Sequence, residues 1–136
     1  MIFPYAELPI RASPYQHQCE AAHFALDRLD SGGGSALLME MGTGKTLTAI
    51  AITGALWNAG QLRHVLIAAP LSILGVWQDE FAKFAAFDYA LTVLKGTAPR
   101  KADDIREADG TALQVLVVNY ESAWRLETEL AKWKPD

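Results

Sequence analysis

The chain has 136 residues, of which 51% are hydrophobic and 21% charged, so it is long enough to bury a core and is neither disordered nor fibrous. Twelve Lys and Arg residues against sixteen Asp and Glu residues give a net charge of −4, which excludes a generally basic surface, so a polyanion would have to be bound locally. The single cysteine, Cys19, excludes an internal disulfide and is expected to be a small core residue.

Membrane association is not expected from the sequence. Residues 46–62 contain no charged side chain, but this stretch includes five polar residues. It falls short of the roughly 20 mostly apolar residues that a membrane span requires, so a buried helix is the better interpretation. Residues 1–15 lack the basic start and apolar run of a secretory signal, which predicts a cytoplasmic protein.

The first predicted element is a helix over residues 16–29. Ser13 and Pro14 are expected to open it as N-cap residue and first-turn proline. The sequence SGGGS at residues 31–35 then ends it. These glycines are expected to form a flexible connector, although their N–H groups could instead bind an anion.

Short hydrophobic runs further along the chain predict strands at residues 36–39, 65–69, 91–94 and 113–118. The second and fourth runs are almost continuously apolar, as is typical of parallel strands buried on both faces. Helical patterns follow these runs at about residues 46–59, 74–84, 97–108 and 121–133. This alternation predicts an α/β fold with a mostly parallel sheet and helices on both faces.

The junction between the first predicted strand and its helix, MEMGTGKT at residues 39–46, has a phosphate-binding pattern. Gly42 and Gly44 allow a tight turn whose N–H groups point inward at the positive end of the helix. Lys45 would reach the β and γ phosphates of a nucleotide, and the Thr46 hydroxyl would complete the coordination of Mg²⁺.

This segment resembles motif I of the superfamily-two helicases, in particular that of the Swi/Snf-type DNA translocases, where Asp-Glu-Met-Gly-x-Gly-Lys-Thr is usual. Met39 is the single departure, in place of Asp. The resemblance implies a P-loop (Walker A) of a RecA-like fold that binds ATP and Mg²⁺. The implied ATP-binding residues are Met41, Gly42, Thr43, Gly44, Lys45 and Thr46, with Lys45 and Thr46 in catalytic roles.

The sequence PYQ at residues 14–16 resembles the Q motif of the same family, in which the glutamine amide reads the adenine edge. An amide offers both a donor and an acceptor to a base edge. Gln16 lies 29 residues before Lys45, although the tripeptide by itself also describes an ordinary helix start. On the resemblance, Gln16 is expected to bind adenine.

Residues 70–81, PLSILGVWQDEF, resemble motif Ia with the Swi/Snf-type continuation Pro-Leu-Ser-x-Leu-x-x-Trp-x-x-Glu. The resemblance places Pro70, Leu71 and Ser72 near a DNA backbone, at the carboxyl edge of the sheet where ligands of open α/β folds bind. Ser72 could donate to a phosphate oxygen, cap the following helix, or do both. Trp77 is expected to be a core residue rather than a base-stacking platform.

Residues 117–122, VVNYES, resemble motif Ib, again at the carboxyl end of a predicted strand. In the family this edge also faces nucleic acid. Asn119 and Tyr120 are therefore candidates for contact with DNA, and the alternative is a turn residue beside a packed ring.

Other polar residues are not expected to carry chemistry. The three histidines show no metal-ligand spacing. Lys95, Arg100 and Lys101 could line a phosphate path, but a solvated helix face is the expected role.

The resemblance covers residues 14–133 but lacks the Asp-Glu-x-His motif that supplies the catalytic acids of the family. The acidic pairs Asp79-Glu80 and Asp103-Asp104 lie in predicted amphipathic helices and cannot replace it. We therefore expect residues 1–35 to carry the Q-motif helix and the Gly-rich connector, and residues 36–136 to form an incomplete RecA-like ATP-binding domain.

The resemblance implies the N-terminal part of the first RecA-like lobe of a DNA helicase or translocase, an ATP hydrolase that acts on DNA, expected to be double-stranded. A DExH segment and a second lobe of the same polypeptide would complete it, since phosphoryl transfer needs positioned water, metal and charge stabilisation together. By itself, the chain is expected to bind ATP and hydrolyse it poorly. Its expected location is the cytoplasm, in association with DNA, or the nucleus in a eukaryote.

Two other functions stay open at this point. One is a self-contained nucleotide-binding or interaction module that does not hydrolyse ATP. The other is an unrelated P-loop enzyme such as a small-molecule kinase, against which stand residues 70–81 and the lack of a second acidic motif.

Overall fold

The computed structural model describes residues 8–36 and 44–136. The chain divides into two compact units, one formed by residues up to 61 together with residues 80–87, and the other by residues 62–79 and 88–136. We call them unit 1 and unit 2. The predicted strand at residues 36–39 lies outside the described residues except for Ala36, which has no regular structure.

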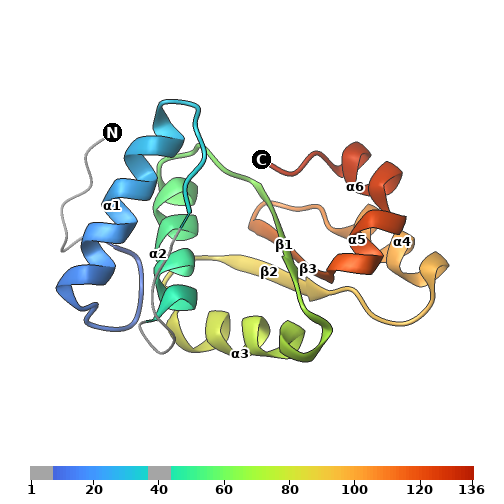
Figure 1. Cartoon of the computed structure of the whole chain (residues 1–136). Helices are drawn as coiled ribbons and strands as arrows, with labels where there is room; N and C mark the ends of the chain where they lie inside the picture. Colours follow the sequence, from blue (N-terminus) through green and yellow to red (C-terminus); the bar gives the residue numbers. More distant parts are fainter. Residues whose placement is uncertain (1–7, 37–43) are drawn as a thin grey trace. The chain divides into compact units, whose positions relative to one another are not determined.

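Unit 1 is built on two helices that lie side by side, α1 (Gln16–Asp30) and α2 (Lys45–Asn58) (Figure 1). Small side chains, which allow close approach, form much of their contact. The buried cluster consists of Leu8, Cys19, Ala22, Ala25, Leu26, Ala51, Ile52 and Ala55. Both helices and the core role of Cys19 were predicted from the sequence and are confirmed.

Helix α1 begins at Gln16 as predicted, but its N-cap differs from the prediction. Its N-cap residue is Tyr15, so Ser13 and Pro14 precede the helix. The reason is a local hydrogen bond, because the Tyr15 N–H donates to the side-chain Oε1 of Gln18 at 2.8 Å. This contact supplies the reciprocal half of a capping arrangement and moves the first turn toward Gln18.

The glycine-rich segment after α1 closes the helix. The N–H groups of Gly32 and Gly33 donate to the carbonyls of Leu29 and Arg28, at 3.0 and 2.9 Å. Gly32 has a positive φ of 82°, as is common after a helix end. These two donors are therefore engaged by the helix, which argues against the anion-binding alternative.

The segment before α1 pairs with the chain that follows α3 (Leu74–Phe84). An isolated antiparallel bridge joins Ile10 to Ala85, flanked by hydrogen bonds from Arg11 N–H to Phe84 O and from Ala86 N–H to Pro9 O. Next to this bridge, Gly54 of α2 leaves no room for a side chain. A Cβ atom there would overlap the ring of Phe87 and lie 2.7 Å from Cγ of Pro9.

Unit 2 contains a parallel sheet of β1 (His64–Ala69), β2 (Tyr89–Val93) and β3 (Leu113–Asn119), in the order β1-β3-β2 (Figure 1). The central strand β3 is buried over six consecutive positions, as its apolar run predicts. Ala69 pairs with Asn119, and Val93 pairs with Val117. The carboxyl ends of all three strands therefore lie at one edge of the sheet.

Three helices of unit 2 complete its core, namely α4 (Ala98–Glu107), α5 (Tyr120–Arg125) and α6 (Glu127–Trp133). Alternate residues of β3 face them, because successive side chains of a strand point to opposite faces. The buried cluster consists of Leu94, Ile105, Ala108, Leu116, Val118, Leu126, Leu130 and Trp133. No helix within the described ranges has the length and apolar character needed to cross a membrane.

The helix expected over residues 121–133 is instead two helices separated at Leu126, which has φ −102° and ψ 19°. The far end of the second helix is anchored by Trp133. Its indole N–H donates to the carbonyl of Ala108 at 2.8 Å, and its ring stacks on His64 with centroids 4.4 Å apart. These tertiary contacts fix the end of α6 against β1 and the end of α4.

The amino end of β1 is held by polar contacts. The Asp136 carboxylate accepts hydrogen bonds from the N–H groups of Arg63 and His64, at 2.8 and 2.9 Å. Burial raises the pKa of this carboxyl, but the two hydrogen bonds outweigh it and the pKa lies below its ordinary value. The Nδ1 of His64 contacts the carbonyl of Trp133 at 2.8 Å, so His64 has a structural role here.

Substitution of two helical glycines is expected to have opposite effects. Gly54→Ala should destabilise the chain by about 1–3 kcal/mol, because its Cβ would overlap Phe87. Gly75→Ala should stabilise it by about 0.5–1 kcal/mol, because Gly75 lies in α3 with nothing within 4 Å of an added Cβ. Chemical denaturation measures both values, and equal effects of the two substitutions would contradict the packing described for Gly54.

Candidate functional site

The start of α2 has the features of a phosphate-binding site. Gly44 is its N-cap residue and has left-handed backbone angles, φ 81° and ψ 39°. Its carbonyl accepts the N–H and the hydroxyl of Thr48, both at 3.0 Å, which fixes the first turn. The first N–H groups of an α-helix have no partner within the helix and carry its positive end, so they favour an anion.

Lys45 and Thr46 occupy the first two positions of α2. Lys45 is exposed and Thr46 is half-buried, so both are accessible to a nucleotide. The remaining predicted members of this motif, Met41, Gly42 and Thr43, lie outside the described residues. The chemistry of the described part fits MgATP, since it combines a cation, a hydroxyl and a helix N-terminus at one place.

A glutamine that the sequence did not single out contacts this site. Gln18 is buried, with 5% of its surface exposed. A Cβ atom on Gly44 would overlap Nε2 of Gln18 and lie 3.2 Å from its Cδ. The start of α1 and the start of α2 are therefore in contact through this side chain, and the positive φ of Gly44 favours glycine at that position.

Gln16, the residue predicted to bind adenine, has a different environment. It is exposed, and its amide donates to Oε1 of Glu20 at 2.9 Å. Its neighbours Tyr15 and His17 stack on each other with ring centroids 5.8 Å apart. Gln16 therefore lies on the same helix start as Gln18, but its amide faces solvent and Glu20.

In unit 2, the residues predicted to face DNA follow the carboxyl end of β1. Pro70 precedes a short 3-10 helix, η2 (Leu71–Ile73), which leads directly into α3. Leu71 is 72% exposed, and Ser72 is also exposed. Ser72 lies inside η2, so it does not cap α3; the N–H to carbonyl bond from Ile73 to Pro70 closes this turn instead.

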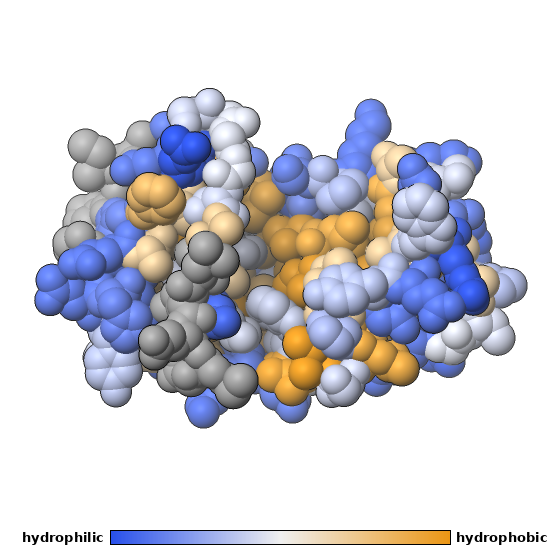
Figure 2. All heavy atoms as spheres, in the orientation of Figure 1, coloured by the Kyte–Doolittle hydropathy of each residue, from blue (hydrophilic) through white to orange (hydrophobic). Residues whose placement is uncertain are grey.

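Hydrophobic side chains are exposed around this turn. Figure 2 shows apolar atoms at the surface over η2 and the start of α3, in contrast with the hydrophilic surface over α4. Ile73 and Val76 add to the exposed apolar surface of Leu71. Trp77 is half-buried, in line with its predicted core position.

At the carboxyl end of β3, Asn119 and Tyr120 take different roles. The Asn119 side-chain oxygen accepts the Ser122 N–H at 2.7 Å, so Asn119 caps α5. Tyr120 is 62% exposed, which contradicts the alternative of a packed ring. One turn further along, Trp124 is 79% exposed, and sequence reasoning missed it. The signal was its spacing of four residues from Tyr120, which places both rings on one side of a helix.

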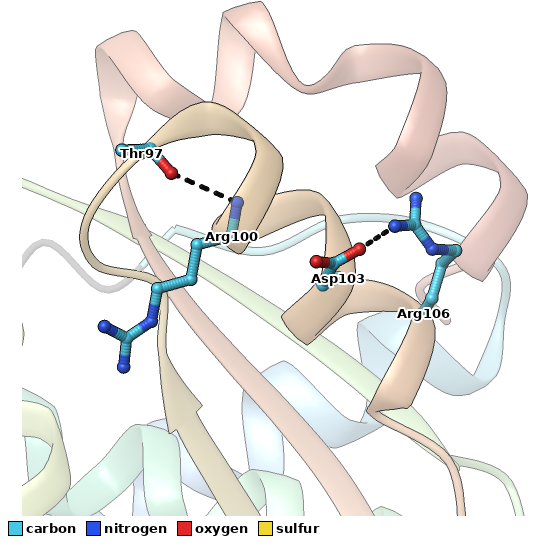
Figure 3. Close-up of polar contacts among 4 residues, drawn as sticks. All are labelled: Thr97, Arg100, Asp103 and Arg106. Atoms are coloured by element: carbon cyan, nitrogen blue, oxygen red, sulfur yellow. Dashed lines mark hydrogen bonds and ion pairs between the residues drawn. The ribbon is translucent and has the colours of Figure 1, made fainter.

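The basic residues that follow the carboxyl end of β2 differ in exposure and in hydrogen-bond partners. Lys95 and Arg100 are exposed, and the Arg100 side chain extends away from α4 (Figure 3). Lys101 is half-buried, and its Nζ donates to the Ser122 hydroxyl at 2.7 Å, so it joins α4 to α5. The prediction of a solvated face is therefore wrong for Lys101.

The predicted acidic pairs lie in helices, as expected. Asp103 pairs with Arg106 on the exposed face of α4, and the Thr97 hydroxyl caps the start of that helix (Figure 3). Asp79 and Glu80 lie in α3. Within residues 8–36 and 44–136, no group of three or more His, Cys, Asp or Glu residues could hold a metal ion.

A cavity of about 540 Å³ lies at the opposite end of the unit 2 strands. It is lined by His64 and Trp133 together with residues on and near α4 and α6, including the charged residues Arg106, Asp109, Glu129 and Lys132. It adjoins the amino end of β1, whereas the predicted site residues of unit 2 follow the carboxyl ends. The cavity is therefore separate from that predicted edge.

Comparison with known proteins identifies the family. Residues 17–134 match the family model of the SNF2-related domain. The chain is 29% identical over 135 residues to the DNA excision repair protein ERCC-6-like of Bos taurus, which covers 95% of this chain and 11% of that protein. It is 28% identical over 140 residues to Switch 2 of Arabidopsis thaliana, covering 90% of this chain and 16% of that protein.

The fold of the chain also matches solved structures of this family. The structure of the Sulfolobus solfataricus SWI2/SNF2 ATPase core in complex with dsDNA superimposes with a TM-score of 0.72 at 25% identity, covering 90% of this chain and 25% of that one. The chain belongs to the SNF2-related domain family. It has the α/β fold of the RecA-like ATPase cores of that family and spans about a tenth of the length of the ERCC-6-like relatives.

The capping role of Asn119 can be separated from any role in ligand binding. Asn119→Ala should lower the free energy of unfolding by about 1 kcal/mol, because the Ser122 N–H loses its acceptor. Asn119→Ser should keep most of that stability, since serine is also a good N-cap residue. Urea denaturation compares the two, and equal stabilities would show that the cap contributes nothing.

Proposed function

We propose that this chain supplies the ATP-binding part of the first RecA-like lobe of an ATP-dependent DNA translocase or helicase. The observation that carries the proposal is the start of α2, where Gly44 in a left-handed conformation precedes Lys45 and Thr46. The SNF2-related family match supports the same function and excludes an unrelated P-loop enzyme such as a small-molecule kinase.

The nucleotide would lie at the start of α2. Lys45 would pair with the β and γ phosphates, and the N–H groups of the first turn would donate to them. Met41, Gly42 and Thr43 would complete the loop, and Gln16 would read adenine after its amide leaves Glu20. The Thr46 hydroxyl would help to hold Mg²⁺, which when bound neutralises charge on the phosphates.

DNA would lie at the carboxyl edge of the unit 2 sheet. Pro70, Leu71 and Ser72 follow β1, and Asn119 and Tyr120 follow β3, so the register brings both segments to one edge. Because the Asn119 oxygen is engaged in the cap of α5, the accessible groups there are the rings of Tyr120 and Trp124 and the hydroxyl of Ser72. The neighbour solved with dsDNA supports double-stranded DNA as the ligand.

Hydrolysis would require groups that this chain does not carry. Its acidic pairs lie in α3 and α4, and no Asp-Glu-x-His follows a strand. We propose that the DExH segment and second lobe of a longer polypeptide complete the site, so that residues 36–136 form only part of a RecA-like domain, preceded by the Q-motif helix. The complete protein would act where DNA is, in the cytoplasm or nucleus.

Nucleotide binding tests the proposal directly. Lys45→Ala should weaken the binding of MgATP by about 10- to 100-fold, because a charge-assisted hydrogen bond to phosphate is lost. Isothermal titration of the purified chain measures this, with Lys132→Ala on α6 as the control. Unchanged affinity in Lys45→Ala would overturn the assignment, and in the complete protein the same substitution should abolish DNA-stimulated ATP hydrolysis.

The aromatic pair on α5 tests the DNA surface. Tyr120→Ala combined with Trp124→Ala should weaken binding to a labelled DNA duplex about 30-fold, since each exposed aromatic contact contributes about 1 kcal/mol. Fluorescence anisotropy at low salt measures the affinity. Phe24→Ala on α1 is the matched control, because Phe24 is also an exposed aromatic residue, at 60%. Equal affinities of the two variants would place DNA elsewhere.

A further inference from the structure

Lys101 and Ser122 form a hydrogen bond between two helices of unit 2. Lys101 is half-buried on α4, and its Nζ donates to the Oγ of Ser122 at 2.7 Å. Ser122 is 9% exposed and lies in the first turn of α5. Its own N–H donates to the side chain of Asn119 at 2.7 Å, at the carboxyl end of β3. One connected set of hydrogen bonds therefore joins α4, α5 and the end of β3.

The orientation of α5 depends on contacts of this kind. The helix has six residues, all of which the structure describes, and Ser122 is the buried one among them. A helix this short is marginal by itself, so tertiary contacts must hold it. The hydrogen bonds of Ser122, together with the packing of the half-buried Ala123 on the core of unit 2, therefore set how α5 lies.

The exposed rings of α5 lie on the opposite side of the helix from Ser122. Tyr120 is 62% exposed and Trp124 is 79% exposed. Each ring is two residues from Ser122, which corresponds to about 200° around a helix of 3.6 residues per turn. The hydrogen bond from Lys101 thus holds the side of α5 that faces away from the proposed DNA surface, and its loss would change the orientation of both rings together.

We propose that Lys101 is a positioning residue for the DNA surface of α5, and this inference rests on the proposed function. Lysine suits the role because its long stem reaches from α4 to α5, while its ammonium donates and needs no acceptor of its own. A charged donor also makes a stronger hydrogen bond than a neutral one. Lys101 acts on DNA through the orientation of Tyr120 and Trp124, without contact to the phosphates.

A double-mutant cycle on thermal unfolding tests the contact without any ligand. Lys101→Met removes the ammonium and keeps most of the apolar stem, whereas Ser122→Ala removes the hydroxyl. In a Lys101→Met background, Ser122→Ala should lower the Tm by about 4 °C less than it does in the wild type, because the bond is already lost. Equal losses of Tm in both backgrounds would overturn the contact.

The affinity for a labelled DNA duplex tests the positioning role. Lys101→Met and Ser122→Ala should each weaken binding about fivefold, because both break the same bond. Neither should change the slope of log affinity against log salt concentration, because no phosphate contact is lost. Lys101→Arg should keep most of the affinity, since a guanidinium also donates. Lys132→Met, which removes the same charge from an exposed position of α6, is the matched control and should bind like the wild type.

The aromatic pair provides a readout that a merely structural role would not change. In a chain that already carries Tyr120→Ala and Trp124→Ala, Lys101→Met should weaken DNA binding by at most about twofold, because the rings through which Lys101 acts are absent. Low salt keeps the weakened complex measurable.

The outcomes separate this inference from the proposed function. Wild-type DNA affinity of Lys101→Met, or a loss that persists in full without the rings, would overturn the positioning role and leave the proposed DNA surface intact. A salt slope smaller by about 0.9 in Lys101→Met would do the same, since it indicates a direct phosphate contact. If the wild-type chain binds no duplex, the proposed surface fails and this inference fails with it. Ser122→Ala keeps the test decisive if Lys101→Met unfolds, because it breaks the same bond and retains the lysine.

Discussion

The pairing of β3 with strands on both of its sides is the constraint on which unit 2 depends. β3 is buried over six consecutive positions, and its register sets Ala69 beside Asn119 and Val93 beside Val117. Parallel pairing means that η2 and α5, which are far apart in sequence, both begin at the same edge. The exposed residues of that edge therefore owe their proximity to backbone hydrogen bonds rather than to contacts of their own.

The proposed ligands, ATP and DNA, are polyanions, whereas the protein is acidic. Local backbone geometry explains how such a protein would bind them. The net charge of −4 describes the whole chain, whereas the proposed phosphate site consists of a helix N-terminus and one lysine. Backbone N–H groups and hydroxyls bind phosphate without adding to the formal charge. In unit 2, Lys101 is engaged with Ser122, so one of the few cations near the carboxyl edge serves the packing of two helices.

An element could be predicted from the sequence where local interactions form it, and could not where contacts between distant residues form it. The β3 strand and α2 could be predicted because continuous burial and helical periodicity are local properties of their sequences. The break at Leu126 could not, because residues 121–133 contain no glycine or proline to mark it, and the contacts of Trp133 with Ala108 and His64 are long-range. The N-cap of α1 was misassigned because the Tyr15 N–H donates to the side chain of Gln18, three residues further on.

The site was predictable to the same extent. The glycine and lysine of the phosphate motif have a recognisable spacing, and the family match agrees with the motifs that carried the resemblance. Gln18 was missed because nothing in its immediate sequence distinguishes a buried amide from an exposed one. Trp124 was missed because its spacing from Tyr120 places both rings on one side of a helix without showing whether that side is exposed. Their exposure, 5% and 79%, is set by residues distant in the chain.

The strand order has a consequence for synthesis of the chain. Both outer strands precede the central one in sequence, so β1 and β2 must remain without their partner until residues 113–119 have been made. Non-local parallel pairing of this kind is slow, because loop closure has to precede the gain from burial. During translation, β1 and β2 therefore lack this strand partner until some fifty and some twenty-five further residues have been added, respectively. Such an interval favours aggregation, because apolar surface and strand edges without a partner associate with other chains.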